Sequence, residues 1–268
     1  MIKLIASDID GTLLKEGSDK LNPEMYTAIR ALKEQGTLFA AASGRSYGSM
    51  ARLFAPVKEE MIFIADNGSN VVCKGYETFS ATLNRKDVED WVLAMRRRED
   101  CQLLLSSKDT VYLEQEEPKL LDLLINGYHN HVELCPDLLK VEDQMVKAAL
   151  YYPAGIRKIA EPIIEEWKDR FHVMVAGDPW LDFVDYRADK GKALATIQEL
   201  LRIAPEETAA FGDNLNDLGM LERAAESYAV ANARPEVKAA AKHITASNAE
   251  DGVLKVLKTM IKRQENHV

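Results

Sequence analysis

The sequence has few cysteines and no long apolar run, and both absences narrow the class of protein. It contains only three cysteines, Cys73, Cys101 and Cys135, with no C-x-x-C pair. An odd number of widely spaced cysteines disfavours both a disulfide framework and a zinc cage. No stretch approaches the roughly 20 consecutive apolar residues that a membrane helix needs. We therefore expect free thiols and no membrane span.

An excess of basic residues is also missing. The chain carries 34 Lys and Arg against 43 Asp and Glu, for a net charge of -9. Such a chain repels a nucleic-acid backbone, so we expect no DNA or RNA partner. Asp8 and Asp10 precede any long apolar segment, so the start does not resemble a secretory signal and we expect a cytoplasmic protein. No repeat or low-complexity segment occurs, and no pattern indicates an obligatory protein partner.

Apolar runs that alternate with amphipathic stretches predict a parallel sheet at the start of the chain. Asn22 and Pro23 are typical of a helix start, and Gly36 of a helix end. Strand and helix alternation implies right-handed crossovers and helices on both faces of the sheet. We therefore predict an α/β, Rossmann-like core. Its expected strands are 2–5, 38–42 and 61–65, and its expected helices are 23–35 and 47–54.

The pattern changes near residue 84 and returns near residue 181. Adjacent strand candidates between these points favour hairpins, so we predict that 84–180 forms an inserted α+β domain with an antiparallel sheet. Residues 1–83 and 181–268 then form the core, since a chain of 268 residues is long enough for two compact parts. The expected helices are 85–98, 120–125, 157–170, 190–201, one through Met220 and one starting at Pro235; the expected strands are 102–107, 110–115, 146–153, 172–177, 207–212 and 227–232.

Two acids stand at the end of the first predicted strand, in LIASDIDGT. Residues i and i+2 of an extended segment point to the same side, so Asp8 and Asp10 would converge and repel unless a cation or proton intervenes. A turn also favours Asp and Gly and needs no chemistry. This motif alone does not decide between the two interpretations.

A second acidic stretch, FGDNLNDLGML, follows another predicted strand. If the two strands are neighbours, Asp8, Asp10 and Asp213 meet in one place. Hard oxygen ligands without His or Cys suit Mg²⁺ better than zinc. The sequence therefore predicts a magnesium site at this edge of the sheet.

Phosphate-binding groups are expected beside such an ion, because protein-bound Mg²⁺ usually also coordinates substrate phosphate. Ser43 and Gly44 follow a predicted strand and precede a helix, whose amino terminus attracts anions. Lys190 stands beside Gly191 at another helix start. A solvated surface lysine is the alternative interpretation.

The order of the motifs DxDGT, SGR, DKG and GDNxND resembles the haloacid dehalogenase superfamily, specifically its Cof-type phosphatases, over essentially the whole chain. The resemblance implies that Asp8 is the nucleophile and that Asp10 is the general acid and base and offers its backbone carbonyl to Mg²⁺. It also implies that Asp213 is a metal ligand, supported by Asp217. The phosphate contacts that it implies are the Ile9 N–H, Ser43, Gly44, Lys190 and Asn216.

The same resemblance implies hydrolysis of a small phosphorylated metabolite, such as a sugar phosphate, through an aspartyl-phosphate. Residues from about 84 to 180 match the position of the family's cap, in which no substrate motif is recognisable. A sugar phosphomutase uses the same intermediate and stays an alternative, as does a non-catalytic phosphosugar sensor. A response-regulator receiver phosphorylated at Asp66 is disfavoured by the chain length and the insertion.

Three further residues or pairs have either an open role or a structural one. Trp180 either lines a substrate pocket or packs. Arg45 either touches substrate or borders the site. Asn67-Gly68 predicts a hairpin turn.

Overall fold

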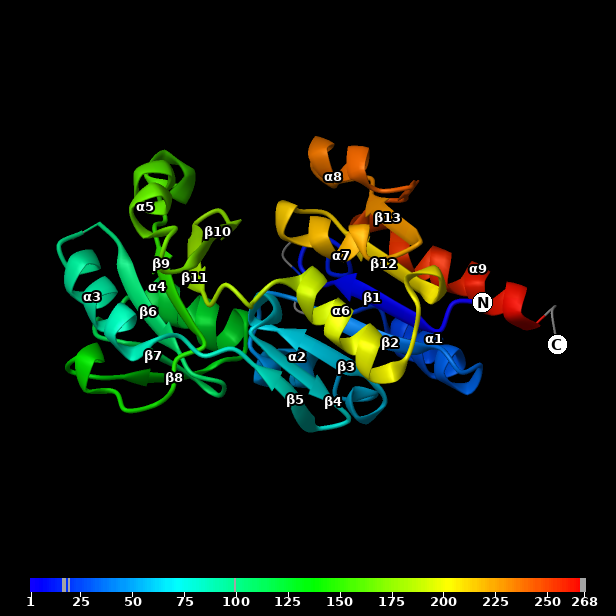
Figure 1. The fold of residues 1–268 in the computed structure, drawn as a ribbon, viewed down its shortest axis with the longest axis horizontal. Coiled ribbons are helices and arrows are strands. Elements are labelled where there is room, and N and C mark those ends of the chain that lie inside the picture. The colour runs from blue at the N-terminus through cyan, green and yellow to red at the C-terminus, as the bar shows by residue number, and fades with distance from the viewer. Residues whose placement is uncertain (16–17, 19, 99, 266–268) are drawn as a thin grey trace.

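The structure, a computed structural model, describes residues 1–15, 18, 20–98 and 100–265. These residues form two sheets that lie side by side in Figure 1, the smaller one in green on the left. The larger sheet has eight strands in the order β14-β13-β12-β1-β2-β3-β4-β5, and the smaller has six in the order β10-β11-β9-β6-β7-β8. The amino terminus and the far end of the helix Gly252–Glu265 lie at the end of the larger sheet that is remote from the smaller one (Figure 1).

The larger sheet is parallel from β14 to β3, and β1 lies at its centre between β2 and β12. The strand order changes direction at β1, which places the following helices on opposite faces because crossovers are right-handed. The predicted Rossmann-like core is confirmed. Its strands are β1 (Leu4–Asp8), β2 (Leu38–Ala42), β3 (Ile62–Ala65), β4 (Asn70–Cys73), β5 (Tyr76–Ser80), β12 (Thr208–Gly212), β13 (Glu226–Val230) and β14 (His243–Thr245).

The helices of this part form two groups. In one group α1 packs against α9, and in the other α6 packs against α7 and α7 against α8. The helix α1 begins as predicted, since the Asn22 side chain accepts a hydrogen bond from the Glu24 N–H and Pro23 takes the first position. The helices are α1 (Pro23–Glu34), α2 (Tyr47–Leu53), α6 (Lys190–Leu201), α7 (Leu218–Glu222), α8 (Pro235–Ala240) and α9 (Gly252–Glu265).

The smaller sheet is antiparallel except for the parallel pair β7 and β8. A core of its own holds it together, in which Trp91 and Phe171 both pack edge-on against Phe183. Its strands are β6 (Gln102–Ser106), β7 (Thr110–Leu113), β8 (His131–Leu134), β9 (Lys147–Tyr151), β10 (His172–Gly177) and β11 (Trp180–Val184). Its helices are α3 (Arg85–Met95), α4 (Pro118–Asp122), continued by the π-helical turn η3 (Leu123–Gly127), and α5 (Ala160–Trp167).

The smaller sheet extends beyond the boundary predicted between residues 180 and 181. That division falls inside β11, which pairs with β10 and with β9 up to Val184. The turn at Asp178 and Pro179 makes β11 the return strand of a hairpin, so it stays with the sheet that β10 belongs to. No helix in the part of the chain that the structure describes is both long and apolar enough to cross a membrane.

Candidate active site

The carboxyl ends of four neighbouring strands meet at the edge of the larger sheet that faces the smaller one. Asp8 ends β1, Ser43 follows β2, Asp66 follows β3 and Asp213 follows β12. A cavity of about 150 Å³ opens there, lined from both sheets. Ligands of open α/β sheets bind at this edge, so the cavity is the candidate active site.

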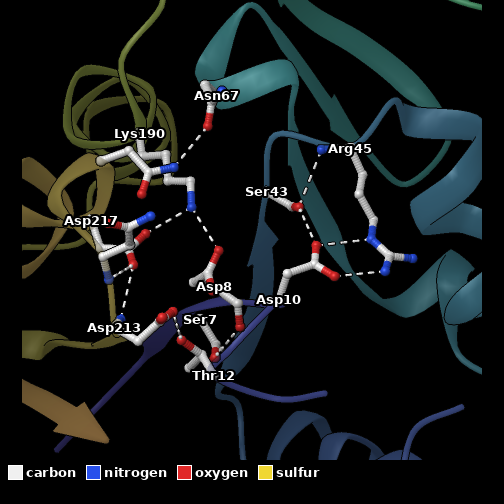
Figure 2. A network of polar contacts seen from close by, with 12 residues as sticks. Ser7, Asp8, Asp10, Thr12, Ser43, Arg45, Asn67, Lys190, Asp213 and Asp217 are labelled. Atoms are coloured by element: carbon white, nitrogen blue, oxygen red, sulfur yellow. Dashed lines mark hydrogen bonds and ion pairs between the residues drawn. The ribbon is translucent and has the colours of Figure 1, made fainter. Parts of the chain in front are cut away.

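A buried lysine lies between two of the acids. Lys190 Nζ donates to Asp8 Oδ1 and to Asp217 Oδ1, each at 2.7 Å (Figure 2). Lys190 is only 1% exposed, which rules out the solvated surface lysine. Gly191 allows this placement, since a Cβ there would lie 2.5 Å from the Gly219 carbonyl oxygen. The first turn of α6 therefore presses against α7 and delivers its lysine to Asp8.

Asp213 and Asp217 differ in how their carboxylates are held. Asp217 Oδ2 accepts hydrogen bonds from the N–H groups of Asp213 (2.9 Å) and Asn214 (3.0 Å), so both of its oxygens already have donors. Asp213 Oδ1 accepts from the Thr12 hydroxyl at 2.8 Å. Gly11 lies in the left-handed region at φ 89°, and a Cβ there would lie 2.5 Å from Asp213 Oδ2. Glycine lets this loop approach the acid.

The acidic cluster fits a hard divalent cation. One ligand oxygen each from Asp8, Asp213 and Asp217 lies within 4.8 Å of the others. Asp8 Oδ2 is buried and has no hydrogen-bond partner among the described residues. Burial raises the pKa of Asp8 well above its usual value and also raises the pKa of Asp213, with nearby acids adding to both shifts. Three carboxylates and one lysine sum to a charge of -2 when ionised, which a divalent cation would balance.

The side chain of Asp10 does not join this cluster. Arg45 donates to both of its oxygens, at 2.6 Å and 2.9 Å, and the Ser43 hydroxyl lies 3.3 Å from one of them (Figure 2). The expectation that the carboxylates of Asp8, Asp10 and Asp213 meet is therefore wrong for Asp10. The chain turns after Asp8, where the Ile9 carbonyl accepts hydrogen bonds from Leu13 and Leu14, so the two-residue period of a strand no longer holds. The predicted metal contact of the Asp10 backbone carbonyl stays a prediction.

The residues predicted to bind phosphate surround the same edge. Ser43, Gly44 and Asn216 line the cavity, and Lys190 lies beside Asp8. Ile9 is fully buried directly after Asp8. Their contacts with phosphate stay predictions, and the structure places all five next to the acidic cluster or the cavity.

The sequence left the roles of Trp180 and Arg45 open and did not indicate Lys147. Trp180 both lines the cavity and packs, with its ring centroid 4.8 Å from that of Tyr151. Arg45 lies over the ring of Tyr128 at 5.3 Å and borders the cavity. Lys147 also lines it from the smaller sheet, and no motif marked this residue.

Asn67-Gly68 forms the predicted hairpin turn between β3 and β4, yet it also belongs to the site. Asn67 Oδ1 accepts a hydrogen bond from Asn216 Nδ2 at 3.0 Å. Asp66 is 1% exposed, so it does not offer the accessible phosphoacceptor that a receiver needs. The sequence feature that could have placed Asn67 in the site is the position of Asp66-Asn67-Gly68 at the carboxyl end of a predicted strand.

Comparison with known proteins agrees with this geometry. Residues 5–257 match the haloacid dehalogenase-like hydrolases. The 5-amino-6-(5-phospho-D-ribitylamino)uracil phosphatase YbjI of Escherichia coli is 28% identical over 271 residues, covering 98% of this chain and 97% of the relative. The Bacillus subtilis phosphatase YcsE, named for the same compound, is 26% identical and covers 96% and 95%.

A solved structure supports the same assignment over the whole fold. A crystal structure from Eubacterium rectale shares 35% identity with a TM-score of 0.85, covering 97% of this chain and 99% of that one. The predicted resemblance is confirmed, and the chain belongs to the family of haloacid dehalogenase-like hydrolases.

Proposed function

We propose that this phosphatase hydrolyses a small phosphorylated metabolite with the help of Mg²⁺ and through an aspartyl-phosphate on Asp8. One observation carries the proposal. The Asp8 carboxylate is buried, has one oxygen held by Lys190 and the other without a protein partner among the described residues, and belongs to an acidic cluster. Such a group is arranged to share a cation and a phosphoryl group rather than to stabilise the fold.

Asp8 is the nucleophile of this proposal. It forms a bond to phosphorus while the ester P–O bond breaks, which splits hydrolysis into two easier steps. Lys190 neutralises charge beside Asp8, and Asp217 holds that lysine in place. Asp8 and Asp213 are the direct carboxylate ligands of the metal, beside the backbone carbonyl of Asp10, because both oxygens of Asp217 are already bound by protein donors. A bound Mg²⁺ would supply further neutralisation of the phosphoryl oxygens.

Asp10 moves the protons. Its carboxylic acid protonates the leaving alkoxide, and the resulting carboxylate takes a proton from the water that attacks the phosphorus of the aspartyl-phosphate. Phosphate and the free Asp8 carboxylate are then released. The side chain of Asp10 is 48% exposed at the cavity, so it is accessible to leaving group and water, and Arg45 fixes its direction.

Residues 84–184, which carry the smaller sheet, serve as the cap in this proposal. They supply one side of the cavity, including Tyr128, Lys147 and Trp180, and a closed cap would exclude bulk water. The names of the curated relatives make 5-amino-6-(5-phospho-D-ribitylamino)uracil a first compound to test.

Phosphate release from a panel of small phosphomonoesters tests the proposal. We expect turnover with Mg²⁺, none in EDTA, recovery on adding Mg²⁺ back, and loss of turnover in Asp8→Asn. Full turnover in metal-free EDTA buffer would contradict the metal role of these acids. Transfer of the phosphoryl group to a second sugar hydroxyl instead of water would favour the mutase, and tight binding without turnover would favour the sensor.

A further inference from the structure

A mostly buried lysine from the smaller sheet, Lys147, reaches the loop that is predicted to bind phosphate. Lys147, the first residue of β9, donates from Nζ to the Gly44 carbonyl at 2.9 Å. The same ammonium lies 3.4 Å from Asp66 Oδ1 and 3.8 Å from Asp182 Oδ2. Its side chain is 14% exposed, and both acids are buried. The contact joins two residues that are 103 positions apart in the chain.

Asn67 carries the connection on to the second phosphate-binding loop. Its side-chain amide donates to Asp182 Oδ2 at 3.4 Å and accepts from Asn216 Nδ2 at 3.0 Å. It also packs on Gly44, where a Cβ would lie 3.2 Å from Asn67 Nδ2. One buried amide therefore touches both loops and the smaller sheet, and Figure 2 shows it above Lys190.

The turn that carries Asn67 is itself fixed to the loop after β2. The Asn67 N–H donates to the Ser43 carbonyl and the Asp66 N–H donates to the Arg45 carbonyl, each at 2.9 Å. Asp66 and Asn67 adopt positive φ angles of 47° and 55°, which Asp and Asn tolerate better than most residues. Because these hydrogen bonds and the Asn67 side chain join the two loops, a shift of Gly44 or Asn67 would be passed from one loop to the other.

Burying the charged side chains of this network costs free energy of folding. Burial raises the pKa of Asp66 to about 6 in spite of Lys147, and burial also raises the pKa of Asp182. For Lys147, burial opposes the charge, but the two acids outweigh it and its pKa is raised. Well-packed apolar residues would usually be at least as stabilising as buried ions. The direct hydrogen bond from Lys147 to the Gly44 carbonyl suggests that the network positions the site in addition to holding the two sheets together.

We propose that Lys147 is a positioning residue of the phosphatase reaction. With the smaller sheet seated, its ammonium fixes the peptide of Gly44, and Asp182 fixes Asn216 through Asn67. The phosphate site is therefore complete only when the two sheets are docked. This inference rests on the proposed function, because it assumes that the loops at Gly44 and Asn216 hold phosphate.

The test uses Lys147→Met, the double variant Lys147→Met with Asp66→Asn, and Lys119→Met on the exposed face of α4 as a matched control. Binding of inorganic phosphate in the presence of Mg²⁺ is measured by calorimetry, and the unfolding midpoint is measured in parallel. We expect Lys147→Met to weaken phosphate binding about tenfold, the equivalent of one lost hydrogen bond. The midpoint should fall as well, because two buried acids lose their cation.

The double variant separates positioning from charge balance. Removing one of the two acids should raise the midpoint back towards wild type, whereas phosphate affinity should stay low because no group holds Gly44. Recovery of affinity together with the midpoint, or unchanged affinity in Lys147→Met, would overturn the proposal. Should Lys147→Met not fold, the double variant carries the comparison, and its failure to bind less phosphate than wild type refutes the inference.

Failure of the proposed function gives a different result. A wild-type protein that binds phosphate but hydrolyses none of the phosphomonoesters would contradict the phosphatase mechanism. The comparison of phosphate affinities among the Lys147 variants would still be valid. A wild-type protein that binds no phosphate would overturn both. The Lys119→Met control should match wild type in affinity and midpoint.

Discussion

The Asp66→Asn substitution gives a quantitative test of the electrostatics at the junction of the two sheets. Asp66 is 1% exposed, and neither carboxylate oxygen has a hydrogen-bond partner among the described residues, although Lys147 lies 3.4 Å from one of them. Burial raises its pKa from 3.8 to about 6, because Lys147 offsets only part of the desolvation. Asparagine keeps the shape of the side chain and removes the charge.

The pKa shift fixes the sign and size of the expected effect. Between pH 3.8 and about 6 the folded protein keeps a proton on Asp66 that the unfolded chain has released. The stability that this proton contributes is fully present below pH 3.8 and is lost as the pH rises through about 6. A shift from 3.8 to about 6 corresponds to about 3 kcal/mol at 1.36 kcal/mol per unit. The free energy of unfolding of Asp66→Asn minus that of wild type should therefore increase by about 3 kcal/mol across this window.

Urea unfolding at a series of pH values measures this difference. Asp109→Asn, at an exposed carboxyl in the turn between β6 and β7, is the matched control. We expect a difference from wild type that rises with pH for Asp66→Asn and stays flat for the control. A flat difference for Asp66→Asn would show that pairing with Lys147 cancels the effect of burial, and a difference that falls as the pH rises would show that pairing outweighs it; either result would refute the reasoning.

Two further predictions concern the acids of the site. Asp10→Asn should slow hydrolysis of a sugar phosphate by about 10²–10⁴-fold, yet rapid mixing with p-nitrophenyl phosphate should release a burst of about one nitrophenolate per site, because that leaving group needs no proton; equal slowing of both esters without a burst would argue against proton transfer. Asp213→Asn should weaken Mg²⁺ binding, measured by calorimetry, by about tenfold or more because a charged ligand is lost, and unchanged affinity would place the ion elsewhere.

The sequence predicted strands at the positions of β1, β2, β3, β6, β7, β9, β10, β12 and β13. It missed β4 and β11 in the interior of the sheets, as well as β5, β8 and β14 at their edges. The central strand β1 is buried along its whole length and therefore reads as an apolar run. By contrast β5, β8 and β14 are edge strands with mostly exposed residues, so no apolar run marks them. Their pairing depends on neighbours that are already in place.

The same physical distinction holds within the site. Asp8 and Asp213 could be brought together from the sequence because parallel strands end at one edge. The direction of the Asp10 side chain could not, since it is set by a turn outside the strand and by Arg45. Lys147 could not be assigned either, because its contact with Gly44 depends on how two sheets with separate cores are placed against each other.

Asp8 and Asp10 differ in the cation that each carboxylate contacts and in their exposure to solvent. Asp8 is buried against Lys190, so its carboxylate is shielded from water and held next to a positive charge. Asp10 is half exposed against Arg45, on the side where a leaving group or water can reach it. A nucleophile benefits from the first environment and a proton carrier needs the second. If one lysine served both carboxylates, each proton gained by Asp10 would change the charge felt by Asp8. In the proposed mechanism, separate cations would allow Asp10 to gain and lose its proton while the Asp8 carboxylate stays ready to attack phosphorus.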